Sequence, residues 1–182
     1  MDLCLELKAN LPRQLCQEII ERFEKDPRRF QGVTGSGLNT GVKSSTDLMF
    51  SRYEDWDDVN KQLDDILRKN MQVYQKFLES KFPMMSPMLS TAWHSGYQIQ
   101  KSGHYVWHQD SAFEYGRQRV LTFIWYLNTI EEGGGTGFMY KTVQPETGKC
   151  VMFPATWNYV HCGFPAVNKY IVTGWLWQEV DH

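Results

Sequence analysis

Residues 120–140 read Val-Leu-Thr-Phe-Ile-Trp-Tyr-Leu-Asn-Thr-Ile-Glu-Glu-Gly-Gly-Gly-Thr-Gly-Phe-Met-Tyr. A run of eight mostly apolar residues ends at Leu127, a glycine triplet follows at 133–135, and another short apolar segment begins at Gly137. Short runs rich in β-branched and aromatic residues and bounded by glycine are typical of strands. The glycine triplet indicates a turn or a close backbone approach. The same pattern extends outward and predicts further strands at Tyr97–Gln100, His104–His108, Cys150–Phe153 and Tyr170–Trp177.

Helical periodicity is confined to the first half of the chain. Apolar residues recur every four positions at Leu11, Leu15, Ile19 and Phe23, which predicts a helix that Asn10 caps and that ends at Asp26-Pro27. A second, longer helix is predicted over residues 57–80, stopped by Pro83. Between them, residues 32–46 are rich in Gly, Ser and Thr and predict a flexible loop or a loose hairpin, serving either as a lid over a substrate or as an ordinary connector.

Two helices followed by many strands predict a mostly β (α+β) fold in one domain. Helices within about residues 1–90 would support a β-sandwich or jelly roll over about 91–178. The 182 residues, 42% of them hydrophobic, suffice for one sizeable core. The formal net charge of −2 disfavours a nucleic-acid partner. The chain shows neither a signal peptide nor an apolar run long enough for a membrane span, so we expect no membrane association and a cytoplasmic location.

The four cysteines are scattered, so neither a disulfide framework nor a zinc site is expected. Cys162 directly follows His161. Because neighbours on a strand point to opposite faces, we expect Cys162 to be a packed thiol rather than a ligand.

His108 and Asp110 form a His-x-Asp pair, and His161 follows later in the chain. On a strand, residues i and i+2 face the same side, so His108 and Asp110 would aim an imidazole and a carboxylate at one point. His161 would join them from a distant strand or its edge. Two His and one carboxylate that leave open positions are typical of non-haem Fe(II) oxygenases. A lone His-x-Asp is more often a surface or hydrogen-bonded pair, and the later His and Lys favour the metal interpretation.

Lys169 stands at the head of the last apolar run and shares a strand face with Ile171 and Thr173. A buried lysine is costly unless an anion neutralises it, and a dicarboxylate co-substrate would supply that anion. The alternative is a solvated lysine on an edge strand.

Several motifs together resemble the Fe(II)- and 2-oxoglutarate-dependent dioxygenases, in the prolyl-4-hydroxylase-like branch. They are Tyr105-Val-Trp-His-Gln-Asp110, Thr122-Phe-Ile-Trp-Tyr-Leu-Asn128, Glu132-Gly-Gly-Gly-Thr-Gly-Phe138, and His161 with Lys169-Tyr170. The resemblance spans about residues 91–178 and implies a double-stranded β-helix. It also implies that His108, Asp110 and His161 bind iron and carry catalysis.

The resemblance further implies that Lys169 pairs with the C5 carboxylate of 2-oxoglutarate. Thr173 and Tyr126 would assist Lys169, although Tyr126 is equally well explained as core. Tyr105 would line the pocket. The tyrosine that many relatives use at the keto-acid end is replaced here by Gln or Ile, so Gln98 or Gln100 is a weak candidate for that role. The presence of Asp110 disfavours halogenation.

The implied function is hydroxylation of peptidyl proline, with a free amino acid or small metabolite as the alternative substrate and a non-redox metal-binding module as a less favoured reading. The implied cofactors are Fe(II), 2-oxoglutarate and O₂, with ascorbate as a candidate reductant. Arg119 and Trp107 are the candidates for substrate contact. Arg117 is expected to be solvated, and core packing is the default for Trp107 and Trp157. The oligomeric state is left open.

Overall fold

Two long strands, β5 (Gln98–His108) and β11 (His161–Glu179), organise the computed structural model, which describes residues 2–83 and 92–180. The other elements are, in chain order, β1 (Leu5–Leu7), α1 (Arg13–Lys25), β2 (Phe30–Gln31), β3 (Lys43–Leu48), η1 (Phe50–Arg52), η2 (Glu54–Trp56), α2 (Asp57–Lys81), β4 (Trp93–His94), β6 (Phe113–Glu114), β7 (Arg117–Tyr126), β8 (Thr136–Phe138), β9 (Lys141–Val143) and β10 (Cys150–Pro154). Residues 84–91, where the predicted supporting half meets the predicted jelly-roll half, lie outside the described ranges.

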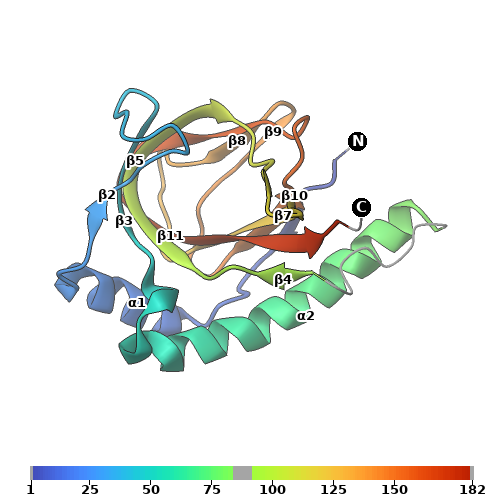
Figure 1. Ribbon diagram of the computed structural model, residues 1–182. Helices are drawn as coiled ribbons and strands as arrows, with labels where there is room; N and C mark the ends of the chain where they lie inside the picture. The colour runs from blue at the N-terminus through green and yellow to red at the C-terminus, as the bar shows by residue number, and fades with distance from the viewer. Residues whose placement is uncertain (1, 84–91, 181–182) are drawn as a thin grey trace.

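The strands form a jelly roll, as predicted. The main path of the sheet runs β1-β10-β7-β11-β5-β3-β2, and the pairs along it are antiparallel. The first residues of β11 also pair with β8, which pairs with β9. Because β11 pairs with β8 at its start and with β7 and β4 further along, the strands curl around an interior rather than forming one flat sheet (Figure 1).

Both long strands bend at the same level. Gly103 has φ 90°, and a Cβ there would lie 1.2 Å from the carbonyl oxygen of Ser44 in β3. Opposite Gly103 is Ala166 of β11, where the register shifts, and Asn168 adopts a φ of 56°. Only glycine permits both the positive φ and the close approach of β3, so position 103 requires a residue without a side chain.

Alternation along the central strands separates a helix-facing core from an inner pocket. In β7, Leu121, Phe123 and Trp125 belong to the core cluster shared with the helices, whereas Thr122, Ile124 and Tyr126 line the pocket. In β11, Val172 and Leu176 face the core, and Ile171, Thr173 and Trp175 face the pocket. The apolar runs seen in the sequence therefore arise because both faces of these strands are covered.

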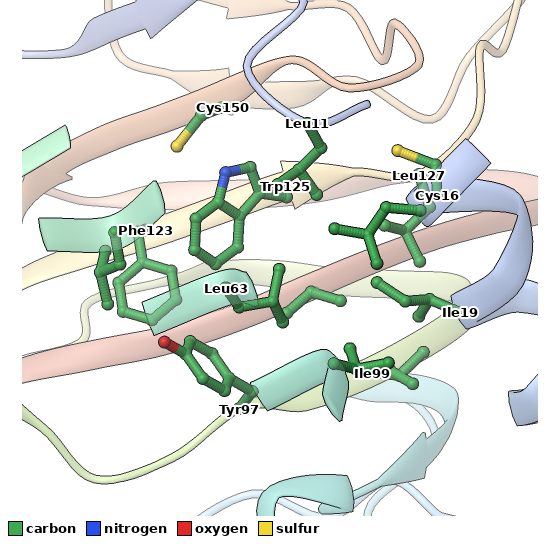
Figure 2. Packing of buried hydrophobic residues seen from close by; sticks show 14 of the residues in the cluster. Leu11, Cys16, Ile19, Leu63, Tyr97, Ile99, Phe123, Trp125, Leu127 and Cys150 are labelled. Atoms are coloured by element: carbon green, nitrogen blue, oxygen red, sulfur yellow. The ribbon is translucent and has the colours of Figure 1, made fainter. Parts of the chain in front are cut away.

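Helices α1 and α2 lie on the same side of the strands (Figure 1). Their apolar stripes, including Ile19 and Leu63, pack against Ile99, Phe123 and Trp125 of the sheet (Figure 2). Both helices agree closely with their predicted limits. The predicted cap of α1 is wrong, because Pro12 occupies the N-cap position. The Asn10 side chain instead hydrogen-bonds Asn70 and accepts from the Trp125 indole.

The first half of the chain contains more strand than predicted. Strands β1, β2 and β3 pair with the sheet, and the two strands predicted at 97–108 form the single strand β5. The predicted loop at 32–46 is extended backbone from Lys43 onward, while the chain between β2 and β3 projects on the side away from the helices (Figure 1). Within the described residues, the four cysteines are free, buried thiols, and no helix is long and apolar enough to cross a membrane.

Candidate active site

The predicted metal-binding residues converge at one end of the interior. The side chains of His108, Asp110 and His161 each offer one donor atom, and these atoms lie within 4.8 Å of one another. His108 ends β5 and His161 begins β11, and the two residues are register partners. The expected reason for convergence is partly wrong, because β5 ends at His108 and Asp110 lies beyond it rather than on the same strand face.

Backbone carbonyls orient both imidazoles. Nδ1 of His108 lies 2.8 Å from the carbonyl oxygen of Val106, and Nδ1 of His161 lies 3.3 Å from that of Tyr159. In each ring a protonated Nδ1 would donate to the carbonyl, which leaves the Nε2 lone pair free. The two Nε2 atoms face the Asp110 oxygens at 3.6 and 3.5 Å. The donors are thus arranged around a common point between the three side chains.

Electrostatics keeps these donors in the forms that metals bind. Burial lowers the pKa of His108 to about 4, aided by the neighbouring His161, and burial also lowers the pKa of His161. Both imidazoles are therefore neutral at pH 7. Burial alone would raise the pKa of Asp110, but the two histidines and the hydrogen bonds from Thr122 and Trp175 outweigh it and lower that pKa. Asp110 is therefore an anion.

This donor set fits a divalent iron ion. Two imidazole nitrogens and one carboxylate oxygen suit Fe(II), and the described residues contribute no fourth His, Cys, Asp or Glu donor to the cluster. Positions for a chelating 2-oxo acid and for O₂ would therefore remain open, unlike in a closed structural zinc site. Cys162 is a buried thiol outside the cluster, as predicted, although it belongs to the lining of the same pocket as His161.

Lys169 lies in the same pocket as the three donors, together with Ile171 and Thr173 on its strand face. The lysine is 8% exposed, which contradicts the alternative of a solvated edge-strand residue. Its Nζ donates to the carbonyl oxygens of Gly134 and Phe164 at 3.0 and 3.4 Å. Burial lowers its pKa to about 8, and no carboxylate of the described chain lies within ion-pair distance of it. The pocket therefore holds a buried cation that an anionic ligand would neutralise.

The remaining predicted pocket residues occupy defined positions. The hydroxyl of Tyr126 lies 2.6 Å from Oγ1 of Thr136, and Thr173 donates to the carbonyl oxygen of Phe123 at 3.0 Å. Tyr105 stacks on His108 with 3.5 Å between ring centroids. All three tyrosine and threonine side chains predicted from the sequence line the pocket.

The candidates for substrate contact lie outside that lining. The guanidinium of Arg119 is stacked over Trp175 and Trp177, at 4.1 and 4.9 Å, and donates to the carbonyl oxygen of Asp110 at 3.4 Å. Trp107 is 51% exposed and Trp157 is 77% exposed, so the default of core packing is wrong for both tryptophans. Arg117 is exposed, as expected, and its guanidinium lies over Trp93.

The sequence profile described as the 2OG-Fe(II) oxygenase superfamily matches residues 92–177. This region belongs to the 2OG-Fe(II) oxygenase superfamily. The matched range contains the His-Asp-His cluster and Lys169. The chain is therefore a 2-oxoglutarate-dependent dioxygenase, and the superfamily implies Fe(II), 2-oxoglutarate and O₂. No curated protein matches the sequence.

Solved structures share the oxygenase fold over nearly the whole chain. A viral collagen prolyl hydroxylase from Paramecium Bursaria Chlorella virus-1, in a 2OG complex, is 18% identical with a TM-score of 0.64, and the match covers 97% of this chain and 96% of that one. A Pseudomonas putida prolyl-4-hydroxylase is 15% identical with a TM-score of 0.64, covering 98% and 93%. A Trichoplax adhaerens prolyl hydroxylase in complex with a hypoxia inducible factor peptide is 15% identical with a TM-score of 0.70, covering 95% and 82%.

The oxygenase pocket also contains residues that the sequence patterns missed. Lys43 and Ser45 of β3 line it, although both fall in the segment predicted to be a loop. Gln100 lines the pocket, whereas Gln98 donates to the buried Asp47 at 2.6 Å. The alternation of Lys43, Ser45 and Asp47 on one strand face is a signal in the sequence, but the surrounding glycines and serines obscure it.

Proposed function

We propose that this oxygenase is a hydroxylase in which His108, Asp110 and His161 bind Fe(II) and Lys169 binds the C5 carboxylate of 2-oxoglutarate. The observation that carries this proposal is the combination, in one pocket, of a His-Asp-His donor set and a buried lysine that has no anionic partner among the described residues. When bound, the iron would couple the oxidation of 2-oxoglutarate by O₂ to the hydroxylation of a substrate C–H bond.

The protein's own groups would hold and orient the reactants. Val106 and Tyr159 carbonyls fix the imidazoles, and Thr122 and Trp175 fix the carboxylate of Asp110. Lys169 would neutralise the distant carboxylate of the co-substrate, and Tyr126 and Thr173, which line the same pocket, would assist it. The buried Ile124 and the partly buried Ile171 in the lining would limit the entry of water.

Peptidyl proline is the proposed substrate. Structures that share the fold are described as prolyl hydroxylases, and one of them is bound to a peptide. A peptide would extend from the pocket over the outer surface, where Arg119 and the exposed Trp107 could contact its backbone and side chains. A free amino acid or small metabolite would need no such surface.

The first test is the visible spectrum of the apoprotein mixed anaerobically with Fe(II) and 2-oxoglutarate. We expect a weak charge-transfer band that Asp110→Ala abolishes and that Trp107→Phe, a control change outside the pocket lining, leaves intact. Iron binding without this band would instead favour a non-redox metal module. Absence of iron binding would overturn the assignment of the three ligands.

The substrate is tested separately by mass spectrometry after incubation in air with Fe(II) and 2-oxoglutarate. Proline-containing peptides should gain one oxygen atom, whereas the same peptides with alanine in place of proline should not. Hydroxylation of free amino acids but not of the peptides would show that the substrate class is wrong while the site assignment holds.

A further inference from the structure

A second lysine is buried in the oxygenase pocket. Lys43 begins β3, is 5% exposed and lines the same cavity as the His-Asp-His cluster and Lys169. Lys43 and Lys169 are the two lysines among the described lining residues, and no arginine lines the cavity there. Burying a lysine costs free energy, so both positions call for a partner.

Lys43 is held by a fully buried carboxylate. Its Nζ donates to Oδ2 of Asp47 at 2.7 Å. The carboxylate also accepts hydrogen bonds from Ser45 Oγ at 2.7 Å and from Gln98 Nε2 at 2.6 Å. Asp47 is 0% exposed and is not part of the cavity lining, so it sits behind the lysine. The carboxylate of Asp47 is therefore shared between the Lys43 ammonium and two neutral donors.

The Lys43 ammonium retains donor capacity toward the cavity. An ammonium group carries three N–H donors, and the bond to Asp47 is the one hydrogen bond from Nζ seen among the described residues. Asp47 also fixes the position of the ammonium, so little side-chain freedom would be lost when a ligand binds. Lys43 therefore resembles a preorganised anion-binding group more than a simple structural ion pair.

Lys43 lies close to the proposed metal site. Its Nζ is 5.8 Å from the centroid of the Tyr105 ring, and that ring stacks on His108 at 3.5 Å. Along the strands, Lys43 is the register partner of Tyr105, which in turn pairs with Gly163 of β11. Lys169 lies farther along β11 and is anchored to the carbonyl oxygens of Gly134 and Phe164. The two cations thus occupy different parts of one cavity.

We propose that Lys43 binds the carboxylate at the keto-acid end of 2-oxoglutarate, while Lys169 binds the carboxylate at the other end. This inference rests on the proposed function of the site. A dicarboxylate carries two anionic groups, and the cavity presents two buried lysines on different supports: Lys43 is held by Asp47 beside Tyr105, and Lys169 is held by the carbonyl groups of Gly134 and Phe164. Asp47 acts as a positioning residue, because it contacts the Lys43 ammonium and not the ligand.

The proposal is tested by comparing two keto acids that differ only at the remote end. Both 2-oxoglutarate and 2-oxopentanoate have the same keto-acid group, but 2-oxopentanoate lacks the C5 carboxylate. Each is titrated anaerobically into the Fe(II)-loaded protein, and the charge-transfer band gives the dissociation constant. Replacing a residue that contacts the keto-acid end should lower the affinity for both ligands. Replacing a residue that contacts the C5 carboxylate should lower the affinity for 2-oxoglutarate alone.

The double variant Lys43→Met/Asp47→Asn is chosen because it removes both charges of the pair and leaves no buried charge without a partner. Lys43→Gln is a second variant that removes only the cation and keeps an amide donor for Asp47. We expect each of these variants to raise the dissociation constants of both keto acids at least tenfold. The conservative variant Lys43→Arg should bind both keto acids more tightly than Lys43→Gln does. Lys169→Met should raise the dissociation constant of 2-oxoglutarate at least tenfold and leave that of 2-oxopentanoate within twofold of the parent value. Circular dichroism and the Tm identify the variants that fold.

The outcomes separate the two proposals. If folded Lys43 variants bind both keto acids within twofold of the parent while Lys169→Met loses affinity for 2-oxoglutarate, the role of Lys43 is overturned and the proposed function stands. Weakening of 2-oxoglutarate alone by the Lys43 variants would also overturn it, because Lys43 would then serve the C5 end. If the parent protein binds neither keto acid in the presence of iron, the proposed function itself fails.

Discussion

The indole Nε1 of Trp175 donates a 3.1 Å hydrogen bond to Oδ2 of Asp110. The same carboxylate oxygen accepts a 2.7 Å bond from Thr122 Oγ1 and faces Nε2 of His161 at 3.5 Å. Asp110 lies outside regular strand, yet donors from the neighbouring strands β11 and β7 hold its carboxylate. The orientation of this proposed ligand therefore depends on residues that would not themselves touch the metal.

Replacing Trp175 by Phe should weaken Fe(II) binding about tenfold, because the carboxylate of Asp110 loses a donor that fixes its orientation. Phenylalanine retains an aromatic ring for Arg119 to stack on. Anaerobic isothermal titration calorimetry with Fe(II) measures the change, and Trp107→Phe, an exposed change on β5, serves as the control. Equal affinities for parent and Trp175→Phe would mean that Thr122 alone suffices to hold the carboxylate.

The affinity for 2-oxoglutarate should fall as the pH rises above about 8. Burial lowers the pKa of Lys169 to about 8, so above this pH the free protein holds a neutral amine that must take up a proton when the C5 carboxylate binds. The dissociation constant should rise about tenfold per pH unit there. Titration of 2-oxopentanoate supplies the control, because its binding does not require charged Lys169. Identical pH profiles for the two ligands would argue against the assignment of Lys169.

The same lowered pKa predicts a pH effect on stability without ligand. Below pH 8 the lysine is charged in both states, and the buried charge costs stability in the folded state. Between pH 8 and about 10.5 the unfolded chain binds more protons than the folded protein, so this group's contribution rises with pH. The Tm of the parent relative to Lys169→Met should therefore increase across this window. A constant difference would indicate that the Lys169 pKa is not lowered.

Gly103→Ala should destabilise the fold by at least about 3 kcal/mol, because an added Cβ would lie 1.2 Å from the Ser44 carbonyl oxygen and the backbone has φ 90°. Gly35→Ala is the matched control, because a Cβ at Gly35 meets nothing within 4 Å. Urea unfolding of the parent and both variants measures the free energies of unfolding. A fully stable Gly103→Ala variant would show that the bend of β5 can relax.

Arg119→Met should lower kcat/KM for a hydroxylated peptide at least tenfold and leave the affinity for 2-oxoglutarate within twofold. The buried Nε of Arg119 has no hydrogen-bond partner among the described residues, so the guanidinium keeps donor capacity beside Asp110. Arg117→Met removes an exposed arginine from the same strand and should have little effect. Equal losses in both variants would indicate a general charge effect rather than a contact made by Arg119.

Local patterns determined much of this protein. The apolar runs at 120–127 and 170–177 predicted the central strands, because both faces of those strands are covered and the chain there is mostly apolar. Helical spacing of the apolar residues predicted both helices. The residue types also predicted the chemistry of the site. Two histidines with one aspartate suit Fe(II), and a lysine in a strand-rich core suits a carboxylate ligand.

Other features depended on contacts between distant segments. The sequence predicts Asn10 as a helix cap, but in the folded chain its side chain hydrogen-bonds Trp125 and Asn70 instead. The sequence predicts a loop at Lys43, but pairing of β3 with β5 makes it a strand residue that is buried against Asp47. Sequence alone therefore determined which residues and strands were available. Tertiary structure decided that side chains of other strands hold the Asp110 carboxylate and that a second lysine lines the pocket. The reason is that strand pairing and side-chain hydrogen bonds join residues that no local sequence pattern relates.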